Sequence, residues 1–158
     1  MLITIVLLIK GVNQRKYRRK KTMNAYLEEQ IVKGFMKKQY QERALYMLNS
    51  KKRDRFLFGL TRDHFIDQYL HPIPLKNNTV HQLIMTLKSL SNQDKYYLMV
   101  PGTFDTENAT LETVLLTLFG FGPFILFFMN CGFCYFEEEQ AHGAPGRFIL
   151  WKKKEKPF

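Results

Sequence analysis

The amino-acid sequence predicts an α+β protein in which a helical N-terminal half packs on a four-stranded mixed sheet with a C-terminal antiparallel meander. Apolar residues in the first half recur at helical spacing, whereas the last third holds short apolar runs separated by turn residues. The run from Val114 to Phe136 contains no charged residue, and no other part of the sequence could bury as much apolar surface. We therefore expect a core built around this run, in a single domain over residues 23–152.

The front half is expected to be helical. Asn24 can cap a helix that begins at Ala25, because its side chain can accept a hydrogen bond from the first turn. Helical spacing continues to Leu48, either as one long helix or as two helices with a bend near Gly34. A shorter helix should cover residues 51–60. Its basic residues indicate a solvated face rather than a phosphate site, because no glycines or aromatics are interleaved with them.

The middle of the chain alternates between irregular and regular segments. Thr61–Pro74 contains two prolines and reads as a loop with a short helical turn at residues 65–70. Thr79 is a good cap for a helix over residues 80–90, which carries apolar residues along one face. Tyr96–Val100 has the composition of a strand and is followed by a Pro-Gly turn.

The C-terminal third is predicted to be a helix followed by three strands. The helix spans residues 111–119, and the strands span residues 124–129, 133–137 and 147–151. A tight turn at residues 130–132 and a longer hairpin loop at residues 138–146 predict an antiparallel meander. If residues 96–100 join the same sheet, the intervening helix would form a right-handed crossover and the strands on either side of it would be parallel. This pairing is what makes the predicted sheet mixed.

The charge-free run is long enough to suggest a transmembrane helix. Two breaks argue against this interpretation. Residues Gly120 to Pro123 place two glycines and a proline inside the run, and Asn130 to Gly132 add a second turn signal. The pieces between the breaks have the lengths of helices and strands in a globular core, so we expect no membrane span.

The head of the chain, residues 1–22, reads as a translated leader or a disordered segment. Its apolar start is too short to cross a bilayer, and its charges follow the apolar run instead of preceding it as in a signal peptide. Arg18 and Arg19 can be encoded by AGGAGG, a bacterial ribosome-binding sequence, which would place the native start at Met23. The other interpretation is a surface anchor formed by the apolar head and its basic cluster.

The net charge of +10 depends on this head. Residues 1–22 hold seven basic residues and no acidic one, so the 17 basic and 14 acidic residues that follow leave a charge of +3. A charge of +10 would suggest a nucleic-acid or membrane-surface partner, whereas +3 does not. We therefore expect neither partner. The lysines of residues 153–158 indicate a frayed basic tail.

Cys131 and Cys134 form a Cys-x-x-Cys motif directly after an apolar strand. The motif resembles the redox site of thioredoxin-like proteins, where the N-terminus of a helix lowers the pKa of the first thiol. Here Tyr135 and Phe136 continue as strand, and too few residues follow for the rest of that fold. The alternative is a turn cysteine followed by a small core residue. Only two cysteines and no signal peptide indicate a reducing cytoplasm.

Asp63, His64, Asp67 and His71 gather in one predicted loop. Neighbouring Asp and His side chains can form an acid–base pair, and loop residues often bind ligands. Their spacing fits no metal motif, so we expect a ligand-binding loop without a metal. The acidic run Glu137–Glu139 at the end of a strand is typical of a solubilising sheet edge.

No phosphate-binding loop, nucleophile elbow or kinase motif set is present in the sequence, so no catalytic residue or cofactor is assigned. The leading hypothesis is a small bacterial cytoplasmic interaction or regulatory protein without catalysis. An aromatic content of 15% suits a protein partner, although the same residues could simply fill the core. The alternatives are a small-molecule binder or enzyme using the loop from Asp63 to His71, a thiol redox protein using Cys131 and Cys134, and a membrane-associated protein.

Overall fold

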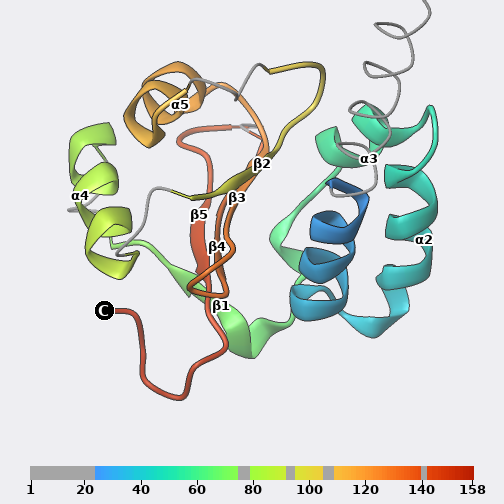
Figure 1. Ribbon diagram of the computed structural model, residues 1–158, viewed down its shortest axis with the longest axis horizontal. Helices are drawn as coiled ribbons and strands as arrows, with labels where there is room; N and C mark the ends of the chain where they lie inside the picture. Colours follow the sequence, from blue (N-terminus) through green and yellow to red (C-terminus); the bar gives the residue numbers. More distant parts are fainter. Residues whose placement is uncertain (1–23, 75–78, 92–94, 105–108, 140–141) are drawn as a thin grey trace, which may run out of the picture.

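A single antiparallel sheet stands at the centre of the molecule (Figure 1). The computed structural model describes residues 24–74, 79–91, 95–104, 109–139 and 142–158. Within these ranges the sheet has five strands in the order β1-β5-β4-β3-β2. The strands are β1 (Leu70–Pro72), β2 (Tyr97–Met99), β3 (Phe124–Phe128), β4 (Phe133–Glu137) and β5 (Arg147–Leu150).

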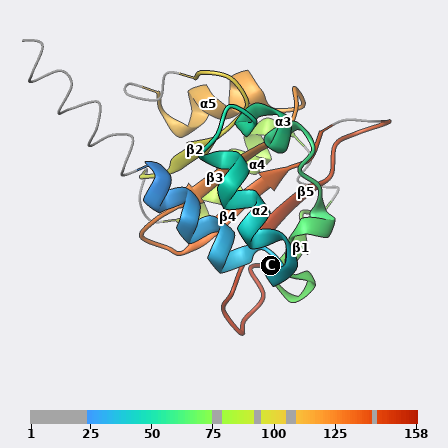
Figure 2. The same cartoon turned by 90° about the vertical axis from the view of Figure 1, so that its right-hand side faces the viewer.

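Helices cover both faces of this sheet, which gives three layers (Figure 1). One face packs against the first helix (residues 24–35), α2 (Lys38–Leu48) and α3 (Arg53–Phe58). These three helices lie toward the viewer in Figure 2. The other face packs against α4 (Val80–Leu90) and α5 (Leu111–Leu118). The prediction that the front helices pack on one side of the sheet holds for the first three helices, whereas α4 packs on the opposite face with α5.

The three central strands are buried along their whole length. Successive side chains of a strand point to opposite faces, so each strand feeds two apolar clusters. Ile125 and Phe127 of β3 join the cluster under the first helices, and Leu126 and Phe128 join the cluster under α4 and α5. This two-sided burial explains why residues 124–128, 133–136 and 148–150 are continuously apolar instead of alternating.

The front helical segment is two helices and not one. Met36 leaves the helix to bridge Phe65, and the Lys37 N–H donates to the His64 carbonyl at 2.9 Å. The break therefore lies two residues after Gly34, where one of the two predicted alternatives placed a bend. It ties the loop that follows α3 to the helical layer.

The predicted parallel pair is wrong. β2 and β3 pair antiparallel, with Met99 opposite Ile125. The chain therefore leaves β2 and enters β3 at the same end of the sheet. The α5 helix lies within this long connection between antiparallel neighbours and does not carry the chain across to the opposite end, so the right-handed crossover rule does not apply. The sheet is consequently antiparallel and not mixed.

The prediction of four strands is also wrong, because β1 adds a fifth. Leu70 pairs with Leu150, and Pro72 pairs with Phe148 at the edge of the sheet. The two prolines nearby led to the prediction of a loop. An edge strand tolerates proline because one side of the strand needs no ladder hydrogen bond. The short helical turn predicted before it corresponds to the 3₁₀ turn η2 (Asp67–Tyr69).

Both later helices begin at threonine caps, of which Thr79 was predicted and Thr110 was not. The Gln82 N–H donates to Thr79 Oγ1 at 3.3 Å, and the Thr113 N–H donates to Thr110 Oγ1 at 3.2 Å. The predicted leader, residues 1–22, lies outside the described residues. None of the helices in the described part of the chain is both long and apolar enough to cross a membrane.

Candidate functional site

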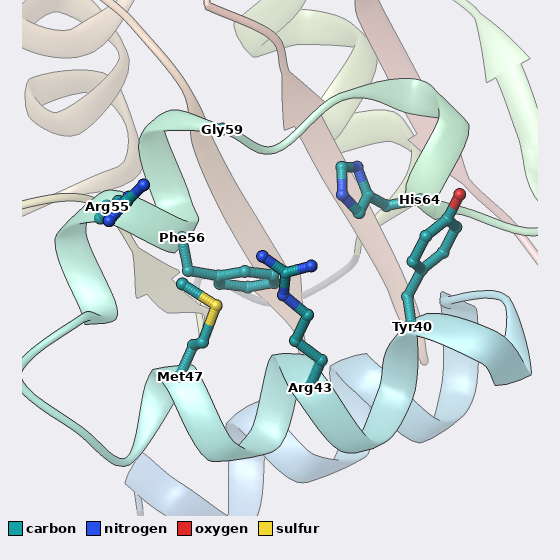
Figure 3. A pocket seen from close by; sticks show the side chains of 7 residues that line it. All are labelled: Tyr40, Arg43, Met47, Arg55, Phe56, Gly59 and His64. Atoms are coloured by element: carbon teal, nitrogen blue, oxygen red, sulfur yellow. The ribbon is translucent and has the colours of Figure 1, made fainter.

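A pocket of about 200 Å³ opens between α2, α3 and the 3₁₀ turn η1 (Arg62–His64) (Figure 3). Three short segments that lie apart in the sequence supply its walls. The lining residues are Tyr40, Arg43, Met47, Arg55, Phe56, Gly59 and His64. Of the four loop residues predicted from the sequence, only His64 lines this pocket.

A tight turn between α2 and α3 positions the two helical walls. The Ser50 hydroxyl donates to the Met47 carbonyl at 2.9 Å and accepts the Lys52 N–H at 3.1 Å. Buried Met47 and Phe56 then fix the two helices against the core, so the apolar floor of the pocket is part of the core.

His64 is held in place by its own turn. The Thr61 N–H donates to His64 Nδ1 at 3.2 Å, and the Thr61 hydroxyl and carbonyl oxygens also lie 3.2 Å from this nitrogen. The imidazole lies 4.8 Å from the Tyr40 ring, centroid to centroid, and 6.4 Å from the Phe56 ring. These contacts leave it half-buried at one end of the pocket.

The pocket is basic. Arg43 and Arg55 both contribute to its lining, and no carboxylate of a described residue does. Among the described residues, neither guanidinium makes a hydrogen bond or an ion pair, and both side chains are exposed to solvent. In Figure 3 the Arg43 guanidinium lies in front of the Phe56 ring, with His64 and Tyr40 to one side. The arrangement combines fixed positive charge, hydrogen-bond donors and aromatic surface.

The other three predicted loop residues lie elsewhere. Asp63 is exposed on η1, and Asp67 pairs with Lys37, with Oδ2 3.1 Å from Nζ. His71 belongs to β1, where it pairs with Ile149. Within the part of the chain that the structure describes, no hydrogen bond or ion pair joins any two of the four. No three His, Cys, Asp or Glu side chains gather closely enough there to hold a metal ion.

The two cysteines lie on opposite faces of the sheet. Half-buried Cys131 is in the β3–β4 turn and packs toward α4 and α5, whereas Cys134 is fully buried in β4 among the residues under the first helices. Burial raises the pKa of the Cys134 thiol well above its ordinary value. Strand β4 follows Cys131, with no helix N-terminus to stabilise a thiolate. This placement does not favour the redox hypothesis, which stays a prediction.

A buried ion pair lies at the other end of β4. Glu137 Oε2 accepts hydrogen bonds from Arg147 Nε and the Tyr135 hydroxyl, both at 2.8 Å, and Glu137 Oε1 accepts the Gly120 N–H at 2.6 Å. Burial and the nearby carboxylate raise the pKa of Tyr135. The prediction of a solubilising edge is wrong for Glu137, because this carboxylate is fully buried and hydrogen-bonded.

A second buried carboxylate connects the first helix to α3 and β2. Glu28 Oε1 is 2.6 Å from Arg53 Nη2 and accepts a hydrogen bond from the Tyr97 hydroxyl at 2.7 Å. Burial raises the pKa of Glu28, and the contacts with Tyr97 and Arg53 oppose this rise. Arg53 is thus half-buried in an ion pair and does not face solvent as the sequence suggested.

The remaining pocket residues carry no distinct signal in the sequence. Arg43 and Arg55 look like solvated arginines on amphipathic helices, and Met47 and Phe56 look like ordinary core residues. Only the α2–α3 turn brings them together. The pocket therefore depends on the relative orientation of α2 and α3, which their sequences do not specify.

Fold and site together define a three-layer α+β domain with a small basic pocket in the layer that contains α2 and α3. The comparisons with known proteins add no family to this description. No protein-family model matches the chain, and no curated protein or solved structure is significantly similar to it.

Proposed function

We propose that this protein binds a small molecule in the pocket between α2 and α3. The observation that supports this function is that His64, Arg43 and the Tyr40 ring line one pocket over a buried apolar floor. Binding sites typically combine a mostly apolar, aromatic wall with a few polar groups aimed at one place. The proposal keeps the ligand-binding hypothesis for His64 and moves the site from the loop to the pocket beside it.

The pocket volume limits the size of the ligand. About 200 Å³ lies below the range of roughly 300–1,000 Å³ that is typical of sites for drug-sized molecules. It corresponds to roughly seven water molecules at about 30 Å³ each. We therefore expect a ligand the size of a small metabolite, or one small group of a larger molecule.

The core accounts for much of the aromatic content that suggested a protein partner. The largest fully buried side chains include five phenylalanines and Tyr135. Aromatics that fill the core cannot contact a partner, so they no longer favour the interaction hypothesis over ligand binding. The protein partner therefore stays a prediction, and the cytoplasmic location and bacterial origin stay predictions too.

A fragment screen monitored by ¹H–¹⁵N correlation spectra of the full chain tests the proposed function. Compounds that bind should shift the amide signals of the segment from Tyr40 to His64. The His64→Ala variant should weaken this binding, while its melting temperature stays almost unchanged because His64 is only half-buried. His81→Ala is the matched control, since His81 is exposed on α4 in the other helical layer. Hits that shift only signals outside the pocket would contradict the proposal.

A further inference from the structure

We infer that the ligand of this pocket is a small phosphate monoester that carries an aromatic or apolar group. The inference rests on the proposed function and adds the chemical class of the ligand. It follows from the charge, the donors and the apolar floor of the pocket, taken in turn below.

The positive charge of the pocket favours an anionic ligand. Arg43 and Arg55 are positively charged at any physiological pH, because the guanidinium pKa lies far above neutrality. Neither has an acceptor among the described residues, and the lining includes no acidic side chain. By contrast, Arg53 on the same α3 helix is neutralised by Glu28, and Arg147 is neutralised by Glu137. A ligand with two negative charges would balance the two pocket arginines.

The donors of the pocket suit an oxyanion with several acceptor oxygens. A guanidinium offers a planar fork of N–H groups that matches two oxygens of a phosphate or carboxylate. Arg43 lines the pocket together with His64 and Tyr40, and its fork is drawn in front of the Phe56 ring in Figure 3. An imidazole always carries at least one N–H, so His64 can supply a further donor there. A phosphate has three terminal oxygens to accept these bonds, whereas a carboxylate has two.

The floor of the pocket selects for an apolar group on the same molecule. Met47 and Phe56 are buried and present a thioether and an aromatic ring. A planar ring stacks well on Phe56, and the polarizable sulfur of Met47 tolerates varied shapes. Inorganic phosphate would fill only the charged half of the site, so we expect the ester to bind more tightly than the free ion.

The test is a titration of the full chain with four probes at low ionic strength. Binding of each probe is monitored by ¹H–¹⁵N correlation spectra. The probes are phenyl phosphate, inorganic phosphate, benzoate and phenol. Phenyl phosphate should bind at least tenfold more tightly than phenol and more tightly than inorganic phosphate or benzoate. Added salt should weaken its binding, because screening reduces the attraction to Arg43 and Arg55.

Variants of Arg43 test whether phenyl phosphate binds at this side chain. Arg43→Gln should weaken phenyl phosphate binding roughly ten- to a hundredfold, the range for losing a charged hydrogen bond. Arg43→Lys should recover part of the loss, because it restores the charge without the fork. Lys38→Gln removes the same charge from α2 outside the pocket, and it should change binding by less than about twofold at roughly 0.15 M salt, where charge effects beyond about 8 Å are screened. Arg43 is exposed, so these variants should keep the far-ultraviolet circular dichroism spectrum of the parent.

The outcomes separate this inference from the proposed function. If phenol binds in the pocket as tightly as phenyl phosphate, the pocket binds small molecules but the anion inference fails. Equal binding of benzoate and phenyl phosphate overturns the phosphate assignment. If Arg43→Gln leaves phenyl phosphate binding unchanged, the site is not the one inferred. If no compound, in the titration or the screen, shifts the pocket signals, both the inference and the proposed function fail.

Discussion

At the scale of single residues, we expect the stability of this protein to depend on buried carboxylates whose burial the sequence does not indicate. Glu137 stands first in a run of three glutamates, yet it is fully buried between Arg147, Tyr135 and Gly120. Taking a charge out of water costs several kcal/mol, and hydrogen bonds and a counter-charge must offset that cost. The pair is therefore expected to be far more sensitive to substitution than any ion pair on the surface.

Glu137→Gln should lower the free energy of unfolding by about 3–5 kcal/mol, because the buried Arg147 loses its charged counterpart. Urea unfolding at neutral pH measures the loss. Glu112→Gln is the control: it removes a carboxylate from the exposed Lys88–Glu112 pair and should cost less than about 1 kcal/mol. Similar losses for the two variants would show that the Glu137 cluster is not held as tightly as its geometry indicates.

The two thiols should react at different rates in the folded protein. Cys134 is fully buried and its raised pKa keeps it protonated, so it should resist a thiol reagent at pH 8 until the chain unfolds. Half-buried Cys131 should be labelled first. Mass spectrometry of the labelled chain, with and without denaturant, counts the modified thiols. Rapid labelling of both thiols under native conditions would revive the redox hypothesis.

At the scale of elements, turns at glycine decide where helices stop and strands begin. The chain leaves α5 through Gly120 with a φ of 81° and Gly122 with a φ of 133°, conformations that L side chains rarely adopt. The Gly120 N–H also donates to Glu137, so this turn anchors the buried ion pair. The glycines that suggested a broken membrane helix thus belong to the entry of β3.

Gly120→Ala should destabilise the fold by about 1–2 kcal/mol, the cost of placing an alanine in the left-handed region. Gly59→Ala provides the matched control, because Gly59 has an ordinary φ of −86°. There the change should be neutral or stabilise the fold by up to about 1 kcal/mol, since alanine restricts the unfolded chain more than glycine does. Thermal melts of the two variants measure the difference. A stable Gly120→Ala variant would mean that the turn can adopt another conformation.

At the scale of the whole molecule, one sheet joins two apolar clusters. Strands β3, β4 and β5 contribute side chains to both clusters. Unfolding of either helical layer would therefore expose one apolar face of these strands. Such sharing favours a single cooperative unfolding transition. Trp151 belongs to the cluster under α4 and α5 and provides a natural probe of that side.

Ile31→Ala tests this coupling from the opposite side of the sheet. Ile31 is fully buried in the cluster under the first helices, so truncating it should cost about 2–5 kcal/mol. Trp151 fluorescence and far-ultraviolet circular dichroism should then report the same lowered midpoint of unfolding. Leu83→Ala, fully buried in the other cluster, should behave in the same way. If Ile31→Ala leaves the midpoint of unfolding reported by Trp151 fluorescence unchanged, the two layers unfold independently.

Local patterns in the sequence predicted the class of the fold and most of its elements. Helices over residues 80–90 and 111–118 and the strands of the meander follow from local periodicity, threonine caps and glycine turns, which depend on neighbouring residues only. Tertiary structure alone decided the strand β1, the antiparallel pairing of β2, the burial of Glu137 and the pocket beside His64. Each of these depends on which distant segments meet, and a local pattern in the sequence does not record those contacts.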